Sequence, residues 1–170
     1  LRLLELICYG KGDYAQGLSF ARKEVALREG DKNVRYGEAL GQVGSFQQAL
    51  EDFEAAETTF RESLQVLSQF YQPEDLPVVE TNLNIGICAY SQNKLEEAYA
   101  IFKEYLPPDQ TELTSAILQA SYYFGELSLD RGAYDDAERS SMKIKTFYEA
   151  EGLNESPDFA ALLISLARIY

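Results

Sequence analysis

Tiny residues recur along this chain in two series that share one interlocked period, and this recurrence limits the possible folds more than any other feature of the sequence. In the first series a tiny residue stands three places after a large apolar one, at Tyr14/Gly17, Phe53/Ala56, Leu95/Ala98 and Tyr134/Ala137. In the second series it directly follows the large residue, at Val43/Gly44, Ile85/Gly86, Phe124/Gly125 and Leu166/Ala167. Both series repeat every roughly 40 residues, and a fixed period of this length indicates a repeat architecture.

These tiny residues predict close crossings between helices. A helix that crosses its neighbour at a short axial distance needs a residue without bulk at the crossing point. Glycine inside a helix costs about 1 kcal/mol relative to alanine, so glycine repeated in mid-helix indicates a packing gain that offsets this cost. We therefore expect Gly86 and Gly125 to be required for packing.

The rest of the chain has the pattern of helices separated by turns, and no window alternates as a strand would. Turn-forming residues stand at 30–33, 72–77, 107–109 and 152–157. We predict helices over 1–10, 13–29, 33–49, 53–70, 76–92, 95–106, 110–131, 134–151 and 157–170. Such pairs stack, so we expect an all-α fold, a right-handed α-solenoid of antiparallel helix pairs with about four and a half repeats, at 1–32, 33–74, 75–109, 110–154 and an incomplete 155–170.

The repeated pattern resembles the tetratricopeptide repeat (TPR). The best copies are Ile85-Gly86 with Leu95, Ala98 and Phe102, and Phe124-Gly125 with Gly132, Tyr134 and Ala137. A period of roughly 40 residues is longer than the common repeat and is similar to the variant of kinesin light chains and related bacterial proteins. Segments 73–78 and 155–159 resemble that variant's proline- and aspartate-containing entry to the next first helix. The first copy departs from the pattern, because Glu5 stands where the small residue is expected.

The resemblance implies a scaffold for protein–protein interaction, in which the first helix of each pair lines a concave groove. One stripe per first helix then gives the peptide-binding candidates Tyr9, Gln48, Glu80, Asn84, Ile87, Tyr90, Gln119, Tyr122, Glu126 and Arg168. Tyrosine rings offer rigid contact area and amides can pair with a backbone, so this stripe suits a peptide or helical segment. Core packing is the alternative for Ile87, and a solvated carboxylate is the alternative for Glu80 and Glu126.

Two other functions are considered: binding of acidic peptide C-termini and a regulatory role in a larger protein. One subtype of the family clamps acidic peptide C-termini with Lys, Asn and Arg, but the matching slots here hold Gly41, Leu83, Ile87, Tyr122 and Glu126. We therefore do not expect that role. A regulatory or sensor module of a larger signalling or transcription-regulator protein stays open as the alternative to a peptide-binding scaffold.

The charge is strongly acidic and uneven. The net charge is −13, and residues 36–130 hold 16 acidic groups against 3 basic ones. Nucleic acids and anionic membranes require a basic surface, so neither is an expected partner. The excess of acidic groups favours a partner whose bound segment is basic or apolar. The alternative is an acidic outer face that only keeps the chain solvated.

The residue types exclude most catalytic and metal chemistry. The chain has no histidine, which excludes imidazole-based catalysis and imidazole zinc ligands. Adjacent carboxylates such as Glu96 and Glu97 point about 100° apart on a helix, so they do not form a catalytic pair. We expect no enzyme activity, no metal and no cofactor. Cys8 and Cys88 stand in helix-like apolar runs, which suits buried, reduced thiols in the cytoplasm.

No apolar run in the sequence reaches the roughly 20 residues that span a bilayer, so no membrane is expected.

The two ends of the chain are apolar. The last predicted helix, 157–170, is apolar nearly all round, and a solenoid end normally has a polar outer face. We therefore expect 1–170 to be a single solenoid within a longer chain, with further repeats or with self-association through 157–170.

Overall fold

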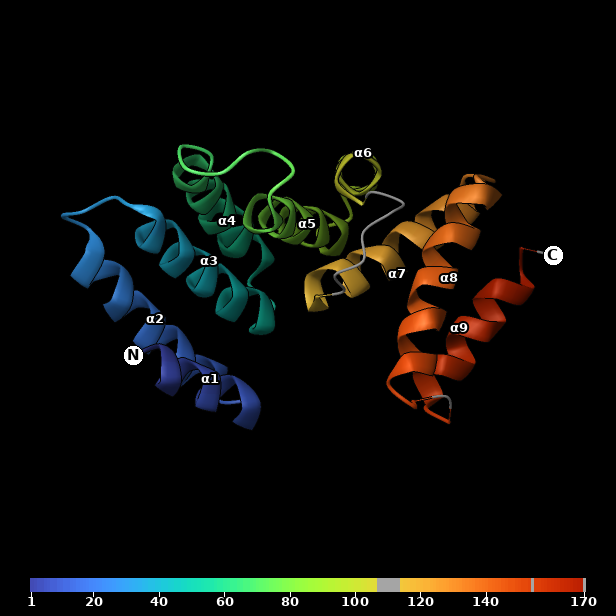
Figure 1. The fold of residues 1–170 in the computed structure, drawn as a ribbon, viewed down its shortest axis with the longest axis horizontal. Helices are drawn as coiled ribbons and strands as arrows, with labels where there is room; N and C mark the ends of the chain where they lie inside the picture. Colours follow the sequence, from blue (N-terminus) through green and yellow to red (C-terminus); the bar gives the residue numbers. More distant parts are fainter. Residues whose placement is uncertain (107–113, 154, 170) are drawn as a thin grey trace.

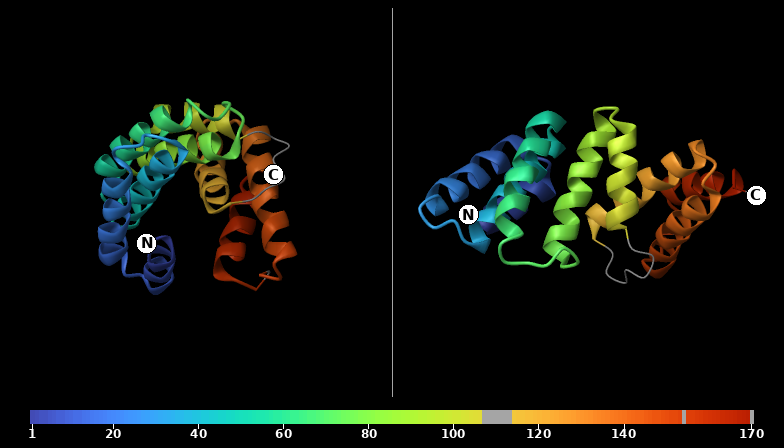
Figure 2. Two further views of the ribbon diagram at one scale, coloured as in Figure 1. Left: turned by 60° about the vertical axis from the view of Figure 1, so that its left-hand side comes forward. Right: turned by 90° about the horizontal axis from the view of Figure 1, so that it is seen from above.

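The computed structural model describes residues 1–106, 114–153 and 155–169, and these form an arch of helices (Figure 1). The helices are α1 (Arg2–Lys11), α2 (Tyr14–Arg28), α3 (Val34–Ala49), α4 (Phe53–Leu67), α5 (Leu76–Ser91), α6 (Leu95–Tyr105), α7 (Ser115–Asp130), α8 (Tyr134–Ala150) and α9 (Pro157–Ala167). The odd-numbered helices lie on the inner side of the arch and the even-numbered ones on the outer side (Figure 2). The expected all-α solenoid of antiparallel helix pairs is confirmed.

Polar N-caps explain where several helices begin. The Asp13 and Asp52 side chains accept hydrogen bonds from the backbone N–H groups of Gln16 and Ala55, at the starts of α2 and α4. Asn33, Thr114 and Ser156 cap α3, α7 and α9 in the same way. An N-cap oxygen satisfies a donor that the first turn leaves free. The expected turn at 107–109 and Tyr170 lie outside the described residues. The helix predicted over 110–131 is corrected to Ser115–Asp130, because Thr114 is its extended N-cap.

The repeat period is also present in the backbone. The residue that links the two helices of a pair has a positive φ in four pairs, at Gly12 (72°), Glu51 (61°), Asn93 (61°) and Gly132 (69°). These positions follow one another with the same period as the tiny residues of the two series. Non-glycine residues seldom adopt this left-handed conformation. At Glu51 and Asn93 it accompanies backbone hydrogen bonds from the Asp52 N–H to the Gln47 carbonyl and from the Lys94 N–H to the Ala89 carbonyl.

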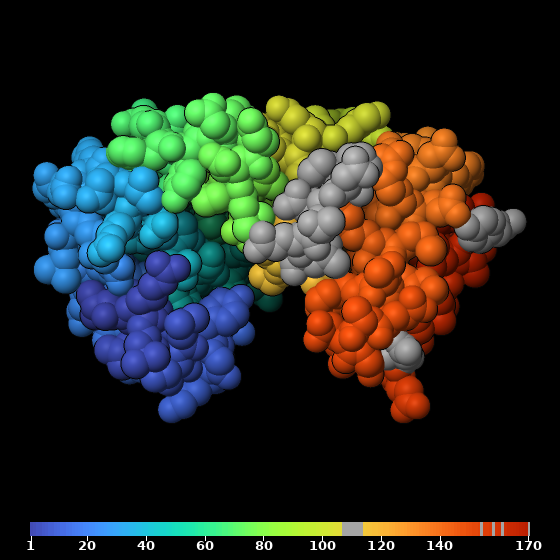
Figure 3. Space-filling view, viewed as in Figure 1, coloured from blue at the N-terminus to red at the C-terminus, as the bar shows by residue number. Residues whose placement is uncertain are grey.

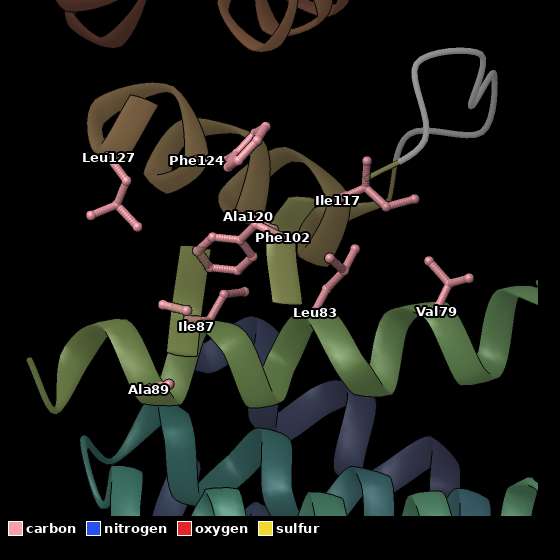
Figure 4. Close-up of a cluster of buried hydrophobic side chains, with 10 residues drawn as sticks. Val79, Leu83, Ile87, Ala89, Phe102, Ile117, Ala120, Phe124 and Leu127 are labelled. Atoms are coloured by element: carbon pink, nitrogen blue, oxygen red, sulfur yellow. The ribbon is translucent and has the colours of Figure 1, made fainter. Parts of the chain in front are cut away.

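The core lies between consecutive helix pairs along the whole arch. Its largest cluster joins α5, α6 and α7 and includes Leu83, Ile87, Phe102, Ile117 and Phe124 (Figure 4). Smaller clusters join α2 to α3, α4 to α5, and α8 to α9. Each helix pair therefore buries its apolar face against its neighbours, as a stacked-repeat protein must.

The crossing glycines of the second and third pairs pack against aromatic rings. A Cβ atom on Gly44 would lie 2.8 Å from Cε1 of Phe60, and one on Gly86 would lie 2.6 Å from Cε1 of Phe102. Each phenylalanine follows its glycine at the same spacing along the sequence. The expectation that Gly86 is needed for close packing agrees with these distances.

The same expectation is wrong for Gly125. A Cβ atom on Gly125 would have its nearest neighbours 3.7 Å away, at Cβ of Ser140 and Oγ of Ser141, which is ordinary contact. The reason is the residue that faces it: Ser141 follows Gly125 at the spacing where the earlier pairs have Phe60 and Phe102. The small serine leaves room that the phenylalanine rings fill.

Both thiols are free and buried. Cys8 lies in α1 and donates its S–H to Oε1 of Gln16 at 3.5 Å, and Cys88 lies in α5. Burial raises the pKa of the Cys88 thiol to about 12, which keeps it protonated. None of the helices in the described part of the chain is long and apolar enough to cross a membrane.

Candidate functional site

The inner side of the arch carries a groove between α1, α3, α5 and α7. The hollow side of the molecule lies between its N-terminal and C-terminal helices (Figure 3). The groove has a volume of about 430 Å³. Its lining is mostly polar: Arg2, Tyr9, Glu38, Gly41, Gln42, Ser45, Gln48, Phe60, Ser63, Leu67, Pro77, Glu80, Thr81, Asn84, Ser115, Ala116 and Gln119.

The floor of the groove comes from α4, an outer helix. On the inner side α5 packs well against α7 but only slightly against α3, so a gap opens between α3 and α5. Gly41 adds no side chain to this gap, and a Cβ atom there would lie 3.5 Å from Oγ of Ser63. Ser63 is buried and donates to the Gly37 carbonyl at 2.7 Å. The predicted stripe lies on the first helices alone and does not include this floor, for which Gly41 of α3 is the available signal in the sequence.

Five of the predicted residues do line the groove: Tyr9, Gln48, Glu80, Asn84 and Gln119. Three of them are amides, which can donate to and accept from a peptide backbone. Nε2 of Gln48 is buried and has no hydrogen-bond partner among the described residues. A buried donor of this kind needs an acceptor, so the groove wall offers one unmet hydrogen bond.

Tyr90, Tyr122, Glu126 and Arg168 form a separate cluster toward the C-terminal end. The ring of Tyr90 stacks on that of Tyr123 with centroids 4.2 Å apart, and Tyr122 meets Tyr123 edge-on at 5.7 Å. Burial, followed by the neighbouring Tyr123 and Glu126, raises the pKa of Tyr90. The cluster extends the inner surface with aromatic area beyond the groove itself.

Glu126 is held by the chain's own last helix. Its Oε2 accepts from Arg168 at 3.2 Å and its Oε1 accepts from the Ser165 hydroxyl at 2.9 Å. Both predicted residues are therefore engaged with each other across α7 and the end of α9.

Ile87 is the predicted residue that offers no surface. Its side chain is 1% exposed and belongs to the core cluster between α5 and α7. Its place in the predicted groove is therefore corrected, and the packing alternative holds for it. The helical stripe misassigned it because α5 is buried on both its α6 and its α7 side, so that most of its residues face other helices.

Three acidic residues of the outer helices, Glu57, Glu96 and Glu97, form ion pairs between neighbouring repeats. Glu57 of α4 accepts hydrogen bonds from Arg61 at 2.7 Å, Lys94 at 2.9 Å and Gln92 at 2.8 Å, and Arg61 also binds Glu97 at 2.6 Å. We call these five residues the Glu57 cluster. Burial alone would raise the pKa of Glu57, but the hydrogen bonds from Lys94, Arg61 and Gln92 outweigh it and lower the pKa to about 2.

The next repeat uses the same contact. Gln92 reaches back 35 residues to Glu57, and Arg131 reaches back 35 residues to Glu96, with which it pairs at 2.6 Å. The Arg131 guanidinium also lies 4.5 Å from the centre of the Tyr99 ring, a cation–π contact. In the groove, Glu38 pairs with Arg2 at 3.6 Å, while Glu80 has no ion pair with any described residue.

Comparisons with known proteins agree with this geometry. Residues 35–107 match the tetratricopeptide repeat family. The whole chain is similar to a putative kinesin light chain with nearly identical TPR-like repeats from Podosopora anserina, with a TM-score of 0.70 and 11% identity over 98% of this chain and 82% of that one. No curated protein sequence matches the chain.

Two further solved structures have the same fold. BtubC (BKLC) from P. vanneervenii gives a TM-score of 0.70 at 16% identity, over 88% of this chain and 62% of that one. The MamA RS-1 ArsTM double mutant gives a TM-score of 0.60 at 15% identity, over 99% of this chain and 89% of that one. Identities this low carry the fold alone. The resemblance to repeats of the kinesin light chain type is confirmed.

Proposed function

We propose that the groove binds a peptide or helical segment of another protein. The premise is that residues 35–107 match the tetratricopeptide repeat family and that the described chain has that fold throughout. Tetratricopeptide repeats generally mediate protein–protein interaction. The observation that carries the proposal is the amide lining: Gln48, Asn84 and Gln119 come from three successive inner helices and face one groove. Amides in such a row can pair with a backbone that runs across the helices.

The segment that fits best is basic or apolar. Glu80 is the groove carboxylate without an ion pair among the described residues, and it would attract a Lys or Arg side chain of the partner. The stacked Tyr90 and Tyr123 and the half-exposed Tyr122 offer aromatic area for apolar or cationic side chains. Because Glu38 and Glu126 already pair with Arg2 and Arg168, we expect the charge preference to be modest.

The first test selects peptides and then removes the amides. A random-peptide library is panned on the protein, and the affinity of a selected peptide is measured by fluorescence polarisation. The double variant Asn84→Ala/Gln119→Ala should weaken that peptide about tenfold or more, because each lost hydrogen bond contributes about 1 kcal/mol.

Gln65→Ala is the matched control, since Gln65 is an exposed amide on the outer helix α4. It should leave the affinity unchanged. Equal losses in the control and the double variant, or selected peptides that are mainly acidic, would contradict the proposal.

We also propose that the exposed face of α9 is covered, by a second copy of this chain or by further repeats. Phe159, Leu162 and Leu166 pack toward α8, while Leu163 and Ile164 remain 43% and 66% exposed. Sedimentation of the chain should show an associated species that Leu163→Glu/Ile164→Glu dissociates, whereas Leu27→Glu on α2 should have no effect. A monodisperse monomer at high concentration, with the mass unchanged in the α9 variant, would refute self-association.

A cytoplasmic location, the absence of catalysis and the alternative of a regulatory module stay predictions. The peptide test measures affinity alone, so its result does not depend on any of these three predictions.

A further inference from the structure

A second cavity lies at the N-terminal end of the arch, between α1, α2 and α3. Its volume is about 680 Å³, which is within the usual range for small-molecule sites. Charges of both signs line it: Arg2, Glu5, Glu24, Arg28, Arg35 and Glu38. It shares Arg2, Glu38 and Gln42 with the groove, but the other four charged residues belong to this cavity alone.

Glu5 is a buried carboxylate at a position where the repeat has a small residue. It stands one repeat before Gly44, yet its side chain is only 3% exposed. Its Oε1 atom has no hydrogen-bond partner among the described residues. A buried acceptor without a partner is unfavourable, so the site is incomplete as it stands.

Unmet donors lie close to this unmet acceptor. Arg28 pairs through Nη2 with Glu24 at 2.9 Å, while its Nε is buried and has no partner among the described residues. Arg35 also lines the cavity and its guanidinium forms no ion pair with a described residue. Burial and then the charge and hydrogen bond of Glu24 raise the pKa of Glu5, which places Glu24 in contact with Glu5 as well as Arg28. Oε1 of Glu5 and Nε of Arg28, which both lack a hydrogen-bond partner, therefore belong to residues on either side of the Glu24 carboxylate.

We propose that this cavity binds a free amino acid, whose ammonium group donates to Glu5 and whose carboxylate accepts from Arg28 and Arg35. A free amino acid carries its ammonium and carboxylate groups a few bonds apart. These two charges match the Glu5 acceptor and the arginine donors, which lie on either side of Glu24. The apolar part of the lining, Val34, Ala39 and the exposed ring of Phe70, favours an apolar side chain on the ligand. The ammonium group of the ligand would offset the burial and the neighbouring Glu24 that raise the pKa of Glu5.

The test uses the wild-type chain and three probes that share one apolar skeleton. L-leucine carries both charges, 3-methylbutylamine lacks the carboxylate, and 4-methylpentanoate lacks the ammonium group. Isothermal titration should show saturable binding of L-leucine, and each singly charged analogue should bind at least tenfold more weakly. No saturable binding of L-leucine, or equal binding of all three probes, would overturn the proposal.

Variants of the chain then locate the site. Glu5→Gln keeps the volume of the side chain and removes its charge, so it should weaken L-leucine at least tenfold. Glu62→Gln, an exposed carboxylate on α4, is the matched control and should leave binding unchanged. Full-strength binding to Glu5→Gln would also overturn the proposal. Because these measurements need no peptide, their failure and a failure of groove binding are distinguishable.

Discussion

Replacing Gly86 by leucine is expected to lower the free energy of unfolding by about 1–3 kcal/mol or more, the usual cost of overpacking a close-packed core. The new Cβ would lie 2.6 Å from Cε1 of Phe102 and 3.0 Å from Cγ2 of Ile101, so the side chains of α6 would have to move. Phe102 cannot move cheaply, because it is fully buried in the cluster that joins α5, α6 and α7. Urea or thermal unfolding followed by circular dichroism measures the change.

Gly125→Ala is the matched control, since it adds a methyl group at the equivalent position of the next repeat. The nearest atoms, in Ser140 and Ser141, are 3.7 Å from the new Cβ, so the methyl group fits. Alanine favours a helix over glycine by about 1 kcal/mol, and the variant should be as stable as the wild type or slightly more stable. A thermal midpoint unmoved by Gly86→Leu would mean that the helix register described above is wrong.

Replacing Glu57 by glutamine is expected to remove about 2 kcal/mol of stability at neutral pH, between the values typical of exposed and of buried ion pairs. The Glu57 side chain is only 11% exposed and holds Arg61, Lys94 and Gln92 at once. Loss of one partner of a buried ion pair can cost about 3–5 kcal/mol, but Arg61 and Lys94 are about half exposed and regain water, which reduces the effect. Glu62→Gln on the same helix should change stability little.

The dependence of this effect on pH follows from the pKa of Glu57. Folding lowers that pKa from 4.5 to about 2, so the folded state favours the charged carboxylate. The stabilisation is therefore complete above about pH 4.5 and is lost as the pH falls toward 2. The difference in unfolding free energy between wild type and Glu57→Gln should shrink over this range. A difference that stays constant from pH 7 to pH 2 would contradict the role of the Glu57 carboxylate.

The fold could be predicted from the sequence because its strongest signal is a spacing. The interlocked positions of Gly44, Gly86 and the alanines fix both the helix pairs and their crossings, and the turn residues fix the boundaries to within a few residues. The helix predicted over 110–131 has its N-cap at Thr114 and spans Ser115–Asp130. α4 ends at Leu67 instead of residue 70, where Ser68 donates its hydroxyl to the Leu64 carbonyl. No local pattern in the apolar run predicts that bond.

The site was only partly predictable, because a helical stripe gives direction and not distance. Asn84 and Ile87 lie one turn apart on α5, yet the first lines the groove and the second is buried against α7. The depth of the groove depends on how far α3 stands from α5, which is a property of packing between repeats. The buried Glu5 and its unmet hydrogen bond were likewise invisible until α1, α2 and α3 were placed together.

The seam between α3 and α5 has a mechanical consequence. On the inner side of the arch these two helices scarcely touch, while on the outer side the Glu57 cluster ties α4 to the turn before α6 and to α6 itself. The arch is therefore fastened on its outer side and open on its inner side at this place. Bending at this joint would widen or narrow the groove, and the Glu57 cluster on the outer side would resist it.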